Sequence, residues 1–92
     1  MVRKLVFRVH PLSRMFERSV RVSEVAETLE RGETIARYDR DRPLPSRFVL
    51  GRSGGRALHV VAADDPGSDL TIVITVYHPD PAIWPPDFRS RR

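Results

Sequence analysis

Residues 70–77 read LTIVITVY, and this stretch decides how the rest of the chain can be arranged. Every position is apolar except Thr71, Thr75 and Tyr77, so both faces of an extended strand would carry apolar side chains. A strand of this kind must be covered on both sides, which is typical of the interior of a sheet. We therefore expect 70–77 to form a central strand.

Three further strand candidates precede it, and turn-like segments separate all four. After Gly32 the apolar pattern changes from a helical period to a period of two, and the candidates cover 34–39, 47–51 and 57–63. The separating segments are RPLP at 42–45, SGG at 53–55 and DDPGS at 64–68. Because links this short allow only antiparallel neighbours, the four strands should form an antiparallel sheet.

The N-terminal third of the chain predicts one more strand and two helices. The strand should cover 4–9, where Leu5, Phe7 and Val9 alternate with Lys4, Val6 and Arg8 on the other face. A first helix should begin near Pro11, with an apolar face made of Leu12, Met15, Phe16 and Val20. A second helix should have Ser23 as its N-cap, end before Gly32, and bury Val25, Ala26 and Leu29.

These elements predict an α+β fold with the order β-α-α-β-β-β-β, in which two helices pack on one face of a mainly antiparallel sheet of four or five strands. A length of 92 residues leaves room for one core, so 1–92 should be a single domain. The segment 78–92 contains four prolines and cannot be a regular element. We expect Ile83, Trp84 and Phe88 to hold this tail against the domain.

Composition narrows the classes of function. The chain has no cysteine, which removes disulfides and thiolate catalysis and fits a cytoplasmic location. Charges interrupt the N-terminal residues, unlike a secretory signal, and no apolar stretch is long enough to cross a membrane. A net charge of +4 favours anionic partners. The loops beside the middle strands add candidate nucleic-acid contacts, which are Arg40, Arg42, Arg47, Arg52 and Arg56. Solvated loop charge is an equally ordinary interpretation.

Several motifs, taken in order, resemble a known family. They are HPLSRMFER at 10–18, VSEV at 22–25, GETI at 32–35, LHVV at 58–61, TVY at 75–77 and PDP at 79–81 with Trp84. Together they resemble the family called domain of unknown function 4258 (DUF4258). That family looks related to RelE, ParE and BrnT toxins, so the resemblance implies a RelE-like fold and an antitoxin partner. Pro11 departs from the alanine that is more usual there, and proline still suits a first helical turn.

Two groups of side chains could carry chemistry, and the first lies on the first predicted helix. His10, Arg14 and Arg18 are spaced four residues apart, and Glu17 lies beside Arg14, so all four can converge on one line of a helix. An exposed ion-pair face is the ordinary interpretation of this spacing. Its recurrence in the family that the chain resembles favours a structural or active-site network in which Glu17 orients the arginines.

The second group lies on the sheet. His59, Thr75 and Tyr77 should share one face, and Arg47 could join them if Phe48 and Leu50 point to the core. Such a set suits RNA cleavage without a metal or cofactor, because a base takes the 2′-OH proton while arginine stabilises the developing phosphorane charge. His59 is the best acid–base candidate. The alternative is a half-buried histidine bonded to a neighbouring side chain.

Two hypotheses of function follow. The first is a type II toxin, a metal-independent endoribonuclease that acts on RNA, including ribosome-associated mRNA, and is neutralised by a cognate antitoxin. Its catalytic candidates are His59, Tyr77, Arg47, Arg14, His10 and Glu17, and its RNA-binding candidates are Arg18, Arg40, Arg42, Arg52 and Arg56. The second is a non-catalytic basic module that binds nucleic acid or an acidic protein. His78 and Asp80 are too sparse for a metal site.

Overall fold

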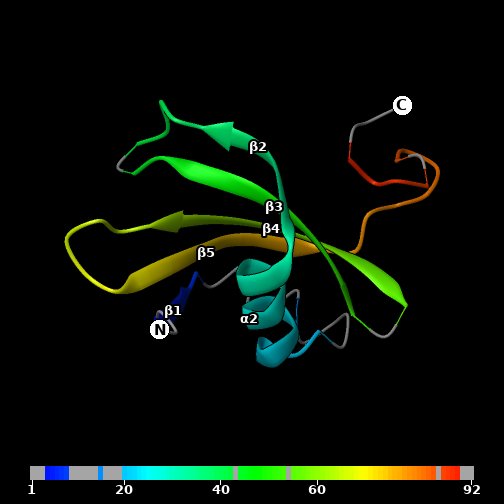
Figure 1. Ribbon diagram of the computed structural model, residues 1–92, viewed down its shortest axis with the longest axis horizontal. Helices are drawn as coiled ribbons and strands as arrows, with labels where there is room; N and C mark the ends of the chain where they lie inside the picture. Colours follow the sequence, from blue (N-terminus) through cyan, green and yellow to red (C-terminus); the bar gives the residue numbers. More distant parts are fainter. Residues whose placement is uncertain are drawn as a thin grey trace.

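A computed structural model describes residues 4–8, 15, 20–42, 44–53, 55–84 and 86–89, and shows a five-stranded sheet with a helix on one face (Figure 1). The strands are β1 (Lys4–Phe7), β2 (Glu33–Tyr38), β3 (Ser46–Ser53), β4 (Arg56–Asp64) and β5 (Leu70–Tyr77), and the helix is α2 (Val22–Arg31). Their order across the sheet is β1-β5-β4-β3-β2. The strand β5 therefore lies inside the sheet, as its two apolar faces predicted.

The sheet is mixed: the four strands joined by short links are antiparallel, as those links predicted, and β1 adds one parallel pair. β2, β3, β4 and β5 pair in sequence order and antiparallel, whereas β1 pairs parallel to β5, with Lys4 opposite Leu70 and Phe7 opposite Val73. The rule that short links require antiparallel neighbours holds for the four strands that such links join. It does not apply to β1, because most of the chain separates β1 from β5.

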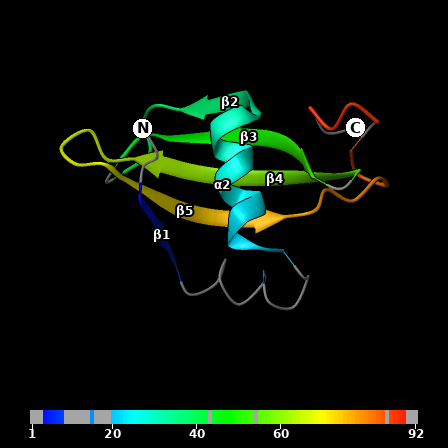
Figure 2. The same ribbon diagram turned by 60° about the horizontal axis from the view of Figure 1, so that its bottom comes forward.

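The prediction of two helices packed on the sheet is also wrong. The described residues form a mostly β structure with a single helix of ten residues, α2, which crosses one face of the sheet (Figure 2). Within the first helix predicted near Pro11, the structure describes Met15 and Val20, and both are buried against the core. The other positions of that predicted helix lie outside the described residues.

The face that carries α2, called the helix face here, contains the main core. Val25 of α2 is completely buried against Leu58, Val60 and Val73, and Leu5, Phe7 and Leu29 pack around them. The helix begins at Val22, so Ser23 is not its N-cap. The Arg21 backbone N–H donates instead to Glu24 Oε1 at 2.9 Å, which satisfies one of the free donors at the start of the helix.

Two glycines allow α2 to approach β3 closely. A Cβ atom on Gly51 would lie 2.7 Å from Thr28 Cγ2, and one on Gly32 would lie 2.6 Å from the Leu50 carbonyl oxygen. Both separations are shorter than van der Waals contact allows. Gly32 has an extended backbone, so it ends the helix by fitting a narrow space and not by adopting a left-handed conformation.

Candidate functional site

The opposite face of the sheet, called the tail face here, lies toward the C-terminal tail (Figure 1). It carries a cluster of rings beside that tail. We call it the aromatic cluster: Phe48 of β3, His59 of β4, Tyr77 of β5 and Trp84 of the tail. The His59 ring centroid lies 4.4 Å from that of Trp84, 4.8 Å from that of Phe48 and 5.2 Å from that of Tyr77. All three contacts are edge-to-face, a favoured geometry for aromatic pairs.

His59 is the centre of this cluster and is completely buried. Its Nε2 lies 2.8 Å from the carbonyl oxygen of Phe88, so Nε2 must carry the proton that is donated. Nδ1 is buried and has no hydrogen-bond partner among the described residues. Burial lowers the pKa of His59 below its ordinary 6.5, and the bond to the Phe88 carbonyl opposes this only in part. At neutral pH His59 is therefore uncharged, with its lone pair on Nδ1.

The tail is held over His59 by several contacts. Trp84 is buried, the Arg52 guanidinium lies 5.4 Å from the centre of the Phe88 ring, and Arg89 pairs with Glu33 at 2.8 Å. Phe88 has φ 56°, a left-handed conformation that is unusual for a side chain of its size. The prediction that Trp84 holds the tail is confirmed, whereas Ile83 is 44% exposed and does not serve this purpose.

The expectation that His59, Thr75 and Tyr77 share one face is right, but this face is covered at His59. His59 and Tyr77 are direct cross-strand partners on the tail face, and Thr75 lies half-buried two residues away from Tyr77. The tail excludes solvent from His59, so its imidazole is not open to a substrate in this conformation. The alternative interpretation named a neighbouring side chain as its partner, whereas the partner is a backbone carbonyl of the tail.

Arg47 is not part of the cluster. Phe48 packs on His59, so the alternation of β3 places Arg47 on the helix face. There its Nε donates to Asp64 Oδ2 at 3.1 Å, and Thr71 donates to Asp64 Oδ1 at 2.6 Å. The sequence predicts Phe48 in the core beneath the helix because it indicates only one buried face. The tail creates a second buried face on the other side of the sheet.

The candidates of the first predicted helix cannot be placed. His10, Arg14, Glu17 and Arg18 lie outside the described residues, so their proposed network stays a prediction. Among the described residues, no three histidine, cysteine, aspartate or glutamate side chains gather as metal ligands. His78 bonds instead through Nδ1 to the Ala57 carbonyl at 2.9 Å.

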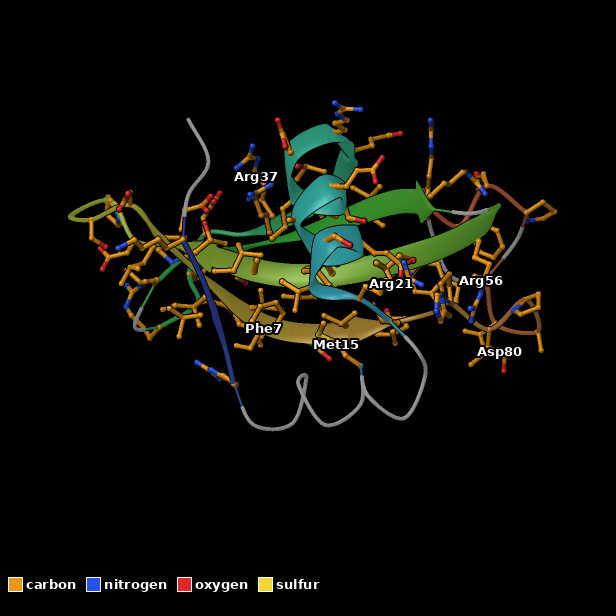
Figure 3. All side chains as sticks on the ribbon, turned by 90° about the horizontal axis from the view of Figure 1, so that it is seen from below. Phe7, Met15, Arg21, Arg37, Arg56 and Asp80 are labelled. Carbon is orange, nitrogen blue, oxygen red and sulfur yellow. The ribbon has the colours of Figure 1, made fainter. Side chains whose placement is uncertain are left out.

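The remaining arginine candidates lie in two places. Arg40 and Arg42 are exposed in the connection between β2 and β3, and Arg52 and Arg56 are exposed at the connection between β3 and β4. Figure 3 places Arg56 at the end of the sheet near the tail, with Arg37 toward the other end. Arg31, which no sequence pattern singled out, lines a pocket together with Arg52 and Arg89.

A second pocket lies on the open part of the tail face. It has a volume of about 270 Å³, and Arg8 and Arg42 border it together with Ile72 and Ile74 of β5. The tail face therefore carries arginine and apolar surface at one end, the covered aromatic cluster at the other, and further arginines beyond the cluster. None of the helices in the described part of the chain is long and apolar enough to cross a membrane.

Comparisons with known proteins give one match. No curated protein and no solved structure matches the chain significantly. The family model described as "Domain of unknown function (DUF4258)" matches residues 7–78, which is more than three quarters of the sequence. The matched range contains β2, β3, β4 and β5, the last residue of β1, α2 and three of the four rings of the aromatic cluster. This chain therefore belongs to the DUF4258 family.

Proposed function

We propose that this domain binds RNA through the arginines at the two ends of β3. The observation that carries the proposal is their exposure: every described arginine except Arg47 is exposed. Among the described residues, only Arg47 and Arg89 form ion pairs. A guanidinium without an acidic partner can bind phosphate without first breaking a salt bridge.

The distance between the two arginine groups favours a polymer over a small anion. β3 has eight residues, so its ends lie about 25 Å apart at the usual rise of a strand. A single phosphate cannot reach both ends, whereas a nucleic-acid chain carries one charge per nucleotide and presents several charges over that span. RNA is the substrate that the resemblance to RelE-type toxins implies.

The test is binding of a labelled single-stranded RNA at several salt concentrations, followed by fluorescence anisotropy. Replacing Arg40, Arg42, Arg52 or Arg56 with Gln should weaken binding and lower the slope of log K against log salt by about one each. Arg37→Gln is the matched control, because Arg37 is exposed but lies opposite Arg47 on the helix face. Equal losses for Arg37→Gln and the four test variants would contradict the proposed interface, and tight binding of an acidic protein without RNA binding would favour the other partner class.

A second candidate is the toxin-type endoribonuclease neutralised by an antitoxin. Two features of His59 support it: the neutral ring with a bare Nδ1, as a general base needs, and the ring of Tyr77 beside it. Catalysis would require the tail to move off His59. The test is expression with and without a cognate antitoxin, together with RNA cleavage by purified protein in EDTA. Normal growth and intact RNA would remove this candidate.

A further inference from the structure

A pocket rich in arginine lies where β3 extends past β2. The pairing of these strands ends with Glu33 opposite Leu50, whereas β3 continues to Ser53 in register with β4. The edge of β3 is therefore left without a β2 partner beyond Leu50. The C-terminal end of α2 and the tail border this unpaired edge, and together they form a pocket of about 320 Å³. Its lining residues are Arg31, Glu33, Leu50, Gly51, Arg52, Asp87 and Arg89.

The charges of the pocket favour an anion. Three arginines, Arg31, Arg52 and Arg89, and two acidic residues, Glu33 and Asp87, line the pocket, so positive charge is in excess. Arg89 already pairs with Glu33 at 2.8 Å, and Arg52 is oriented by the Phe88 ring. Arg31 makes no ion pair or side-chain hydrogen bond with the described residues. The pocket thus has one oriented guanidinium (Arg52), one that is paired (Arg89) and one without a described partner (Arg31). Its volume is at the lower end of the range for ligand pockets.

We propose that this pocket binds a phosphate monoester, such as the terminal phosphate of an RNA chain. A monoester carries nearly two negative charges at neutral pH and three acceptor oxygens, so it can compete with the single charge of Glu33 for Arg89. A phosphodiester has one charge and no such advantage. The planar fork of arginine matches phosphate oxygens, and Arg31 and Arg52 can each contribute one. This inference rests on the proposed RNA binding and adds a site for the phosphorylated end of the RNA.

The experiment compares one RNA sequence with a phosphate at its 5′ end, at its 3′ end or at neither. A phosphorylated RNA should bind the full chain about tenfold more tightly than the unphosphorylated one, the effect of one added charged hydrogen bond. Arg31→Gln and Arg52→Gln should remove that preference. Glu33→Gln should increase it, because it frees Arg89. Arg40→Gln, at the other end of β3, should weaken binding of all three RNAs and keep the preference.

The outcomes separate this inference from the proposed function. Equal affinities for the three RNAs, or a preference that survives both Arg31→Gln and Arg52→Gln, would overturn the monoester site while leaving RNA binding in place. If no RNA binds, titration of uridine monophosphate and of inorganic phosphate, followed by NMR shifts of the pocket residues, decides the question directly. If both anions shift the NMR signals of the pocket residues, the ligand group is phosphate itself. If only the nucleotide shifts them, the pocket is a nucleotide site. Equal NMR shifts caused by a peptide carboxylate would contradict the proposal.

Discussion

His59 has the environment of a core residue, and this has a consequence for stability. Its pKa is lowered below 6.5 in the folded protein, so the unfolded chain binds a proton at higher pH than the folded one. The stability that neutral His59 contributes is therefore complete above pH 6.5 and decreases as pH falls through 6.5 toward the folded value.

We predict that the free energy of unfolding, measured with urea, falls between pH 7 and pH 5.5, and that His59→Gln reduces this dependence. Glutamine can still donate a hydrogen bond to the Phe88 carbonyl but does not titrate. His78→Gln is the control, because His78 is a half-buried histidine that is also bonded to a backbone carbonyl. An unchanged pH dependence in His59→Gln would show that His59 is not the titrating group.

The same residue shows what a single sequence can and cannot predict at this scale. Alternation correctly placed His59 and Tyr77 on one face, because side-chain direction has a strict period of two within each strand. It failed for Arg47, since the direction of β3 depended on whether Phe48 faced the helix or the other side. Apolar character alone does not say which of two buried faces a phenylalanine belongs to.

At the scale of elements, the contact between α2 and β3 depends on Gly51. A methyl group there would lie 2.7 Å from Thr28 Cγ2, and the helix or the strand would have to shift. We predict that Gly51→Ala destabilises the protein by about 1–3 kcal/mol, the usual cost of overpacking. Urea denaturation measures this value.

A double variant makes that prediction specific. Thr28→Ala removes two of the three atoms that a Cβ on Gly51 would meet, so the double variant should be more stable than the sum of the single effects predicts. Gly67→Ala is the control, because the nearest neighbour of its Cβ would be 3.5 Å away. If the losses of unfolding free energy in Gly51→Ala and Thr28→Ala are additive, steric contact between Thr28 of α2 and residue 51 of β3 is not the cause.

Most strands were predictable within one or two residues, and the reason is local. Period-two patterns and turn residues lie within each segment, so β2, β3, β4 and β5 could be found without knowledge of the tertiary structure. The position of β1 depends on a partner more than 60 residues away, and no local pattern encodes a parallel pairing of that kind. The start of α2 differs by little from the prediction, because the Glu24 carboxylate accepts from the Arg21 backbone N–H in place of the expected Ser23 cap.

For the whole molecule, the main unexpected feature is that the sheet is covered on both faces. α2 lies on one face (Figure 1), where Met15 is also buried. The tail covers part of the other face with Trp84 and Phe88. The apolar character of β5 on both faces predicted a central strand but did not identify the second cover. A proline-rich segment has no regular pattern from which its docking position could be derived.

The two candidate functions require different behaviour of this tail, and Trp84 separates them. We predict that Trp84→Ala lowers the free energy of unfolding by about 3–5 kcal/mol, because the ring is buried against His59 and Phe48. Circular dichroism during urea denaturation measures this without the lost fluorescence, and Ile83→Ala, at an exposed neighbouring position, should have little effect. If the domain only binds RNA, loosening the tail leaves RNA intact in EDTA. If the tail covers a general base, Trp84→Ala exposes His59, and cleavage should rise and then disappear in the Trp84→Ala, His59→Gln double variant. Cleavage that persists in the double variant would assign the activity to other residues, and an unchanged stability would show that the tail is not part of the folded core.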